Sequence, residues 1–470
     1  MIRRTRIVCT MGPASTPPAV LRALIRAGMD VARLNFSHGD HTEQERTLLA
    51  VKKLAHECGR HVALLQDLQG PKIRIGGLPG GSIRLLRGEK LRVATRNVDD
   101  SAGAIEINQV ELVQALRRHD KILLQDGEIE LRVLDSDGEQ ARCQVLQGGV
   151  LREHQGVTVP ERDLQMPSLT AKDLDDLKFG ADLGFDYVAL SFVTSAADIE
   201  ACRRALSAVR STVPIIAKLE RARALRHLDE ILAAADGVMV ARGDLGVEMS
   251  LAELPAAQKN IIDRANRAGK PVITATEMLE SMVESSRPTR AEASDVANAI
   301  WDGSDAVMLS QETSIGAHPV RVVRAMAQIC RAAERHPVYR RLRLGQWAAN
   351  TVATAIAAAA SQVAEQVGAR AIVAFTESGA TALRVSKAKP LVPILAASPH
   401  PEILRRTAIY SGVVPLEVVN GTNTDDMIAN ATRAARASGL VRSRDKVVLV
   451  AGTPVGESGQ TNLVQVASIE

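Results

Sequence analysis

The sequence predicts an α/β protein in which a (β/α)8 barrel carries an inserted β-domain and is followed by an open α/β domain. Short apolar runs alternate with helical patterns, three before the insertion and five after it, which is the signature of a barrel. Between them, from Lys72 to about Glu161, apolar residues recur at every second position instead. At 470 residues, the chain has room for roughly two to four domains.

Three strands and two helices are expected ahead of the insertion. Thr16 is expected to cap the first helix, with proline at its first position, and Gly28 is expected to end it. The second helix is expected at Gln44–Cys58. The strands are expected at Arg6–Thr10, Val31–Phe36 and Val62–Asp67.

Five strands after the insertion complete the barrel, and four more belong to the last domain. The five are expected at Asp186–Phe192, Pro214–Leu219, Gly237–Ala241, Pro271–Ala275 and Asp305–Leu309. The four are expected at Ala371–Phe375, Val392–Ala396, Val413–Val418 and Lys446–Val450. We therefore expect residues 1–70 and 162–338 to form the barrel, residues 71–161 the inserted domain, and residues 339–470 the C-terminal domain.

The composition excludes several classes of protein. With 24% charged and 46% hydrophobic residues the chain is not disordered or collagenous, and it has no apolar stretch of about 18 residues that would cross a membrane. The five cysteines form no C-x-x-C pair, which indicates a reducing, cytoplasmic location and neither a zinc nor a redox site. Interspersed charges and only 2% aromatic residues argue against nucleic-acid binding.

Polar residues stand at the carboxyl ends of seven of the expected barrel strands. One such residue is most often a capping group, but side chains at the carboxyl ends of barrel strands converge on one face, so the set indicates a site. The residues are Arg33, Asn35, Ser37, Asp67, Ser191, Lys218, Glu220, Arg242, Gly243, Asp244, Thr276, Glu277, Ser310 and Glu312.

This set predicts phosphoryl transfer. Glu220 and Asp244 are carboxylates from adjacent strands and suit Mg²⁺, a hard cation that keeps some waters. Lys218 lies two residues from Glu220, on the same side of an extended segment, where an ammonium stabilises an enolate or a transferring phosphoryl group. Arg33 and Arg74 offer bidentate phosphate contacts. No Walker loop or Ser-His-Asp signature supports another mechanism.

Seven segments resemble the signatures of the pyruvate kinase family, in that family's order along the chain. They are Thr5–Ser15, Ala32–Gly39, Asp67–Arg74, Ala217–Arg221, Val240–Gly246, Thr276–Met282 and Asp305–Thr313. The resemblance implies a TIM barrel with an inserted β-barrel lid and a C-terminal α/β regulatory domain. It also implies transfer of a phosphoryl group from phosphoenolpyruvate to ADP, the final step of glycolysis.

The resemblance implies a role for each matching residue. Glu220 and Asp244 would hold Mg²⁺, with Mn²⁺ as an alternative, and a second Mg²⁺ would arrive with ADP. Arg33 and Lys218 would bind the phosphoryl group, and Gly243, Asp244 and Thr276 the substrate carboxylate. Water near Thr276 and Ser310 would protonate the enolate. The nucleotide would be bound by Asn35, Ser37, His38, Arg74 and, from the closing lid, Asp126.

Two residues depart from the family pattern. Glu277 stands where the family usually has glutamine, and it is expected to add a negative charge beside Thr276. Gln155 stands where the lid usually offers a lysine, so that one nucleotide contact is in doubt unless His154 replaces it. We interpret both as tuning. They leave open the alternative of a catalytically weak, metabolite-sensing relative.

A further departure concerns monovalent cations. Many members hold K⁺ with groups matching Asn35, Ser37, Asp67 and the residue at Leu68, beside a glutamate at the position of Lys72. An ammonium there supplies a permanent cation and repels another. Because Leu68, Gln69 and Ile75 also match the potassium-independent branch, K⁺ is not expected to be required.

The C-terminal domain contains a candidate effector site. Thr376, Ser378, Gly379 and Thr381 follow the strand Ala371–Phe375 and begin a helix, where hydroxyls and free amides bind anions. A second loop with Gly456 and Ser458 would close over the ligand. Both loops lack Lys and Arg and contain Glu377 and Glu457, so a sugar monophosphate or AMP is expected rather than a bisphosphate. A homotetramer is implied by the resemblance alone.

Overall fold

The computed structural model describes residues 2–95, 104–160, 162, 167–341, 350–419, 421, 424–452 and 461–469. Eight parallel strands close into a barrel in the order β1-β16-β15-β14-β13-β12-β3-β2. They are β1 (Arg6–Thr10), β2 (Val31–Asn35), β3 (Ala63–Asp67), β12 (Tyr187–Leu190), β13 (Ile215–Leu219), β14 (Gly237–Ala241), β15 (Val272–Ala275) and β16 (Ala306–Leu309). Each lies within an expected strand, so the predicted fold class is confirmed.

Helices surround the barrel and bury their apolar faces against the strands. They are α1 (Pro18–Ala27), α2 (His41–Glu57), α4 (Ala171–Leu183), α5 (Ala196–Ala208), α6 (Ala222–Arg226), α7 (Leu228–Ala234), α8 (Arg242–Glu248), α9 (Leu254–Arg267), α10 (Arg290–Asp302), α11 (Gln311–Ser314), α12 (Pro319–Arg335) and α13 (Pro337–Arg341). A 3₁₀ turn, η3, covers Glu280–Val283.

Two helix starts differ from the expectation. The cap of α1 is Pro17, whose side chain cannot accept a hydrogen bond, and not Thr16. Helix α2 begins three residues before Gln44, because the Asp40 side chain accepts a hydrogen bond from the Glu43 amide and so fixes an earlier start. Gly28 ends α1 as predicted, at φ 124°, with its amide bonded to the carbonyls of Leu24 and Ile25.

The inserted β-domain leaves the barrel directly after β3 and returns before α4. Its six-stranded sheet has the order β11-β7-β8-β9-β5-β6, and β10 pairs with β4. The strands are β4 (Ser82–Leu85), β5 (Lys90–Ala94), β6 (Ala104–Glu106), β7 (Lys121–Leu124), β8 (Ile129–Ser136), β9 (Gln140–Gln147), β10 (Gly149–Arg152) and β11 (Val157–Thr158), with η1 at Pro79–Gly81 and α3 at Val110–Ala115. Neither α3 nor β7 was expected from the sequence.

The C-terminal domain is an open α/β sheet with the strand order β19-β18-β17-β20-β21. Its strands are β17 (Ala371–Phe375), β18 (Ile394–Ser398), β19 (Val413–Glu417), β20 (Lys446–Ala451) and β21 (Leu463–Ser468). Its helices are α14 (Val352–Gln366), α15 (Ala380–Lys387), α16 (Pro401–Thr407) and α17 (Thr424–Ala437). The antiparallel edge strand β21 was not expected, because its residues are half exposed and its apolar run is short.

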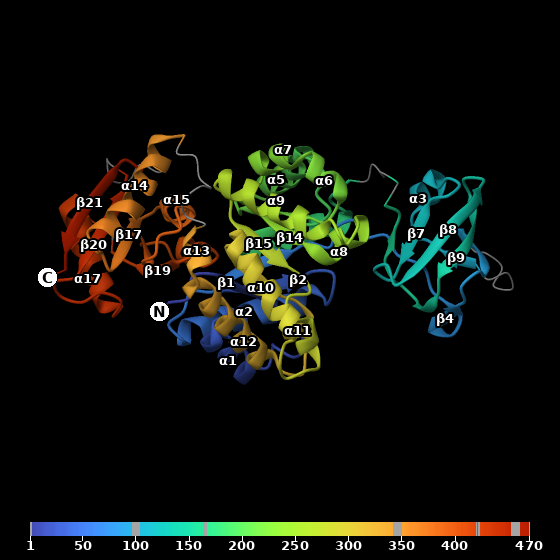
Figure 1. Cartoon of the computed structure of the whole chain (residues 1–470), viewed down its shortest axis with the longest axis horizontal. Coiled ribbons are helices and arrows are strands. Elements are labelled where there is room, and N and C mark those ends of the chain that lie inside the picture. The colour runs from blue at the N-terminus through green and yellow to red at the C-terminus, as the bar shows by residue number, and fades with distance from the viewer. Residues whose placement is uncertain are drawn as a thin grey trace.

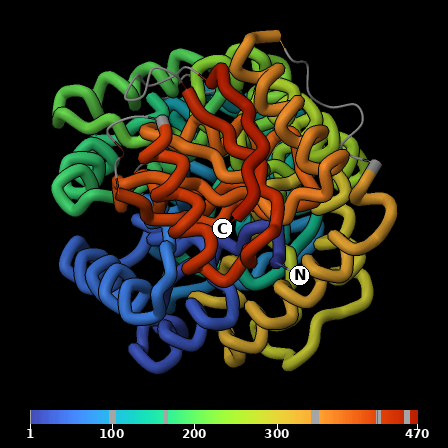
Figure 2. The backbone as a smooth tube through the Cα atoms, turned by 90° about the vertical axis from the view of Figure 1, so that its left-hand side faces the viewer, coloured from blue at the N-terminus to red at the C-terminus, as the bar shows by residue number. Residues whose placement is uncertain are grey.

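The C-terminal domain covers one end of the barrel, and the β-domain projects from the other (Figures 1 and 2). Asp186 and Asp305 immediately precede β12 and β16, and they pair with Arg405 and with Lys387 and Lys389 of the C-terminal domain. These contacts occupy the amino ends of the strands. The carboxyl ends therefore face the β-domain, which is where barrels place their active sites.

No helix in the described part of the chain is long and apolar enough to cross a membrane. The cysteines Cys9, Cys58, Cys143, Cys202 and Cys330 are all free thiols.

Candidate active site

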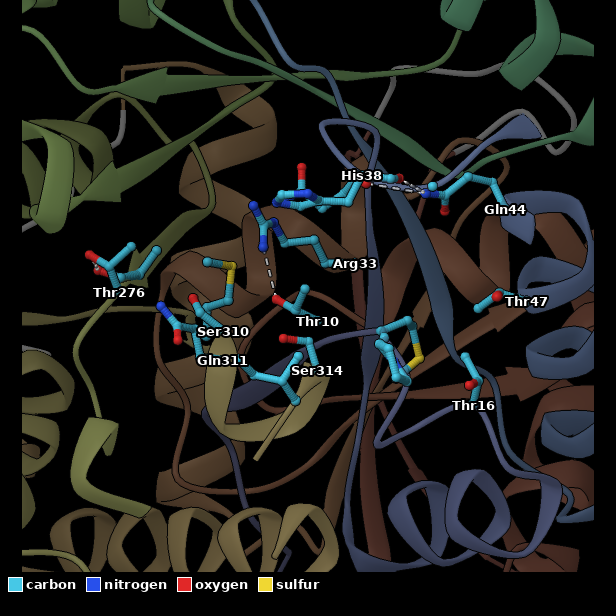
Figure 3. Close-up of a pocket in the computed structure, with 18 of the residues that line it drawn as sticks. Thr10, Thr16, Arg33, His38, Gln44, Thr47, Thr276, Ser310, Gln311 and Ser314 are labelled. Atoms are coloured by element: carbon cyan, nitrogen blue, oxygen red, sulfur yellow. Dashed lines mark hydrogen bonds between the residues drawn. The ribbon is translucent and has the colours of Figure 1, made fainter. Parts of the chain in front are cut away.

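A cavity of about 870 Å³ opens at the carboxyl ends of the barrel strands (Figure 3). Half of the residues predicted from the strand ends lie on its wall, together with His38 from the expected nucleotide contacts. They are Arg33, Asn35, Lys218, Glu220, Asp244, Thr276 and Ser310. The apolar floor between them is supplied by Met239, Ala241, Ala275 and Met308.

Lys218 is the centre of the charged cluster in this cavity. Its Nζ atom lies 2.9 Å from Oε1 of Glu220 and 3.1 Å from Oδ1 of Asp67. It also donates a hydrogen bond of 2.7 Å to Oγ of Ser191, whose hydroxyl in turn donates to the Leu68 carbonyl. The ammonium is thus held by three strands, and the substrate meets it already oriented.

The buried charges of this cluster stabilise one another. Burial alone would lower the pKa of Lys218, but the carboxylates of Asp67 and Glu220 outweigh it and raise that pKa well above its usual range. Burial alone would raise the pKa of Asp67, but Arg33 and Lys218 hold it below its usual value. Lys218 is therefore a permanent cation, which suits stabilisation of an anion and not base catalysis.

Arg33, in the middle of β2, is fixed by hydrogen bonds to residues of the strands on both sides. Its Nε atom donates to Oδ2 of Asp67 at 2.5 Å, and its Nη1 atom donates to Oγ1 of Thr10 at 2.9 Å, as Figure 3 shows for Thr10. A guanidinium held in this way presents its remaining donors to the cavity, where they match the geometry of a phosphoryl group. Thr10 ends β1, and sequence reasoning missed it because it is an ordinary strand residue.

The turn after β15 is backbone-strained. Thr276 and Glu277 both have left-handed φ angles, 66° and 52°, which are uncommon for residues with a side chain and accumulate at functional sites. This turn brings Oγ1 of Thr276 to the amide of Gly243, from which it accepts a hydrogen bond of 2.7 Å. A Cβ atom on Gly243 would meet Oγ1 of Thr276 at 3.5 Å, which is an ordinary contact distance.

Two residues predicted at the carboxyl ends of the strands, Arg242 and Glu277, do not line the cavity. Arg242 supports the turn after β15, and Glu277 is part of it. Arg242 is buried, and its guanidinium donates to the carbonyls of Thr276 and Glu277 and to Asp295. The Glu277 side chain is exposed and lines a different surface groove, together with Arg242. The expectation that Glu277 adds its charge beside Thr276 is therefore wrong, because the left-handed backbone turns this side chain outward.

Ser310 presents an unpartnered hydroxyl at the end of β16. Its Oγ atom is buried, and among the described residues no group forms a hydrogen bond with it. Its amide donates to Oε2 of Glu312 at 2.6 Å, which fixes the backbone and leaves the hydroxyl free. A buried polar atom without a partner is costly and indicates that a water or a ligand completes it.

The carboxylates of Glu220 and Asp244 fit a magnesium site. Glu220 is almost fully buried, and burial first, then the charge of Asp244, raise its pKa, although Lys218 acts in the opposite direction. A nearby divalent cation would relieve this repulsion. In the described residues no three His, Cys, Asp or Glu side chains group together as a metal site. Mg²⁺ usually takes one or two protein carboxylates and completes its coordination with water and substrate oxygens, which a pair of carboxylates allows.

Comparison with known proteins decides the family. The family model "Pyruvate kinase, barrel domain" matches residues 2–323, and "Pyruvate kinase, alpha/beta domain" matches residues 354–467. The chain belongs to the pyruvate kinase family. It is 43% identical to the pyruvate kinase of Corynebacterium glutamicum, covering 99% of this chain and 98% of that one. It is 41% identical to the pyruvate kinase of Mycobacterium tuberculosis, covering 100% and 99%. The chain is accordingly a phosphotransferase.

The residues expected to meet the nucleotide are not all gathered in the cavity. Asn35 and His38 line it, and Ser37 lies between them with its amide bonded to Oδ1 of Asn35. Arg74 instead donates from Nη1 to the His154 carbonyl, and the exposed Asp126 sits on a turn of the β-domain. Both belong to the part of the molecule that the family resemblance describes as a lid.

The electrostatics around His38 favour an anionic ligand. Partial desolvation lowers the pKa of His38, although its side chain is largely exposed, and the cations Arg74, Arg33 and Lys72 lower it further. The positive potential that these cations produce at His38 favours phosphate groups at this end of the cavity.

Two of the four residues that match the family's monovalent-cation site, Asp67 and Leu68, contact other parts of the protein. Leu68 is buried in the barrel wall with its side chain in the apolar core, and the two Asp67 oxygens face Arg33 and Lys218. The Nζ atom of Lys72 lies 3.8 Å from Oδ1 of Asp126 and 3.8 Å from Oδ1 of Asp244. A Cβ atom on Gly156 would approach Cε of Lys72 to 3.0 Å, so the glycine makes room for this lysine.

The predicted effector residues lie at the start of α15. Thr376 and Thr381 are buried, Ser378 is exposed, and Gly379 has the left-handed φ of 88° that its position requires. Gly456 and Ser458 lie outside the described residues. Oγ1 of Thr381 is 3.1 Å from Oγ1 of Thr461, which places Thr461 beside the first turn of α15.

Arg384 is a cation that sequence reasoning missed at this site. Its Nη1 atom donates to Oγ1 of Thr461 at 3.3 Å. It lies one helical turn inside α15 and not in either loop, so the loop sequences alone do not show it. With this cation nearby, a doubly charged effector is less disfavoured than the two loop sequences indicate.

Proposed function

We propose that this protein transfers the phosphoryl group of phosphoenolpyruvate to ADP with Mg²⁺ and produces pyruvate and ATP. The observation that supports this reaction best is the Lys218 ammonium, fixed between Glu220, Asp67 and Ser191 on the cavity wall. Phosphoryl transfer from an enol phosphate leaves an enolate, and a permanent, desolvated cation at the enolate oxygen lowers the barrier.

The residues of the chain divide the reaction between them. Arg33 and Lys218 bind the phosphoryl group, and the backbone around Gly243 and Asp244, together with Thr276, receives the substrate carboxylate. A β-phosphate oxygen of ADP forms the new P–O bond as the bond between phosphorus and the enol oxygen breaks. The enolate oxygen then remains beside Lys218, while the methylene carbon of the enolate gains a proton from water held near Thr276 and Ser310.

Glu220 and Asp244 would hold Mg²⁺ in this proposal. Bound there, the cation would neutralise charge on the phosphoryl and carboxylate oxygens of the substrate. Asn35, Ser37, His38 and Arg74 would bind the nucleotide phosphates. The β-domain, with Asp126, would close over the cavity and exclude water that competes as phosphoryl acceptor.

The domain organisation and regulation form part of the same proposal. Residues 1–70 and 162–338 are the catalytic barrel, 71–161 the lid, and 339–470 a regulatory domain that binds a phosphorylated metabolite at Thr376, Ser378, Gly379 and Thr381. We propose a cytoplasmic homotetramer that needs no K⁺. The free thiols support a reducing compartment.

A lactate-dehydrogenase-coupled assay with phosphoenolpyruvate, ADP and Mg²⁺ tests the reaction. Lys218→Met is expected to lower kcat on the order of a hundredfold or more, because the cation acts on charge that develops during transfer. Lys270→Met is a matched control, since Lys270 is also partly buried in the barrel but donates to the Ala235 carbonyl at the opposite end. Equal turnover by the wild type and Lys218→Met would support the metabolite-sensing alternative.

A further inference from the structure

The loop between β2 and α2 is held by contacts with helix α4. Lys172 donates from Nζ to the Phe36 carbonyl at 2.8 Å and to Oδ2 of Asp176 at 2.6 Å. The other oxygen of Asp176 is 2.8 Å from Nε2 of His41, the first residue of α2. The loop is therefore held to α4 at both of its ends.

The tip of this loop is also held by Gln44 of α2, whose Nε2 atom donates to the carbonyls of Asn35 at 3.1 Å and His38 at 2.8 Å. His38 itself is exposed, whereas Phe36 is 2% exposed and Asp176 only 1%, so the contacts to α4 are the buried ones. The His41 ring stacks on Phe179 of α4, with ring centres 4.0 Å apart. Residues 172, 176 and 179 share one face of the helix, so a single rigid surface contacts both ends of the loop.

The same end of α4 also holds the chain where it leaves the barrel for the β-domain. Oδ1 of the buried Asp173 accepts a hydrogen bond of 3.1 Å from the Gly70 amide. Its other oxygen closes the capping box of α4 with Thr170. The position of α4 therefore fixes the loop and the start of the inserted domain relative to each other.

We propose that Lys172 and Asp176 are positioning residues that set the place of the loop Asn35–Gly39 and thereby the affinity for ADP. This inference rests on the proposed function, in which that loop meets the nucleotide phosphates. Asp176 is buried between two partners, so its carboxylate keeps one geometry. Neither residue lines the cavity of about 870 Å³, so neither touches the substrates.

The proposal predicts separate effects on the two substrates. Lys172→Met frees the Phe36 carbonyl and is expected to raise the KM for ADP about tenfold, with the KM for phosphoenolpyruvate changed less than about twofold. Lys172→Arg is expected to restore most of the ADP affinity, because it retains a cationic donor. Lys178→Met, an exposed lysine on the same helix, is the matched control and is expected to behave as the wild type.

A double variant tests whether the two residues act together. Asp176→Asn is expected to raise the KM for ADP as well. The double variant with Lys172→Met is expected to raise this KM by less than the product of the two single fold-changes. Titration calorimetry of ADP binding and the melting temperature are measured for each variant.

The outcomes separate this inference from the proposed function. If the wild type does not turn over phosphoenolpyruvate and ADP, the proposed function fails. If the wild type turns over and Lys172→Met keeps its ADP affinity, or if both KM values rise in proportion as the melting temperature falls, the positioning role is wrong and the proposed function stands.

Discussion

The Nζ atom of Lys72 lies 3.8 Å from Oδ1 of Asp244, the carboxylate that we assign to the metal. The same ammonium is 3.8 Å from Asp126 on the inserted domain. The Lys72 ammonium thus attracts one carboxylate at the barrel mouth and one on the proposed lid. Many members of the family have a glutamate at this position.

This position predicts the response to K⁺. The wild type is expected to be nearly fully active in tetramethylammonium buffer, because Lys72 already supplies a cation and repels another. Lys72→Glu would place a third carboxylate beside Asp126 and Asp244, lower the K⁺-free rate and restore part of a K⁺ response. Lys90→Glu makes the same charge change on an exposed strand residue and is the control. A several-fold rise in the wild-type rate on adding K⁺ at constant ionic strength would refute this account.

The free hydroxyl of Ser310 predicts a loss of activity without a loss of stability. Ser310→Ala removes a buried oxygen that has no partner among the described residues, so the melting temperature is expected to stay the same or rise slightly. The rate of turnover is expected to fall about tenfold or more, since water near this hydroxyl would deliver the proton. Ser314→Ala on the same wall is the control. A variant with unchanged kcat would remove Ser310 from the proton path.

The cations around His38 predict its titration. In the free protein, NMR titration is expected to give His38 a pKa below the usual value of 6.5, because partial desolvation and three neighbouring cations disfavour its protonated form. Binding of ADP should raise this pKa, since the phosphates offset those cations. His38→Gln assigns the resonance. A pKa that falls on adding ADP would show that the nucleotide binds elsewhere.

The buried contact between the barrel and the C-terminal domain predicts unequal effects of two substitutions. Asp305 faces both Lys387 and Lys389, so the cluster carries one excess positive charge. Asp305→Asn leaves two buried ammoniums without a counter-charge and is expected to destabilise the protein by about 3–5 kcal/mol. Lys387→Met leaves Asp305 paired with Lys389, with no net charge, and is expected to lower the free energy of unfolding much less. Calorimetry that finds the two equally destabilising would contradict this.

The pH dependence of the same cluster has a definite sign. Burial lowers the pKa of Lys387 to about 8 from its usual 10.5, despite Asp305. Between these values the unfolded chain binds more protons than the folded one, so this group makes the protein more stable as pH rises through that window. Subtracting the melting curve of Lys387→Met isolates the effect from Lys389, whose pKa is raised. If the stability difference between the wild type and Lys387→Met does not change between pH 8 and 10.5, the lowered pKa of Lys387 is contradicted.

A charge at Ser378 tests the effector site. Ser378→Asp is expected to abolish activation by sugar monophosphates and AMP, because Ser378 is exposed beside the start of α15 and the added carboxylate repels phosphate. Ser438→Asp places the same charge elsewhere on the domain and should leave activation intact. If every phosphate that activates the wild type activates Ser378→Asp equally, the site is wrongly placed.

The strand-helix alternation made the barrel predictable, because buried parallel strands are short continuous apolar runs. The edge strand Leu463–Ser468 has no such run, and the helix Val110–Ala115 lies inside a region of period-two alternation. Positions such as Lys218 and Ser310 were predictable because the carboxyl ends of all barrel strands meet. The directions in which the side chains point could not be predicted from the sequence. The left-handed backbone at Thr276 and Glu277 turns the Glu277 side chain away from the cavity, and no spacing in the sequence encodes it.

Phosphorus NMR of a mixture of phosphoenolpyruvate, ADP and Mg²⁺ with the wild-type protein tests the central claim most directly. The account predicts that each phosphoenolpyruvate lost is matched by one new γ-phosphate of ATP, with no free phosphate, and that Lys218→Met abolishes this exchange. Release of inorganic phosphate in place of ATP, or phosphoenolpyruvate that persists with the wild type, would contradict phosphoryl transfer between these substrates.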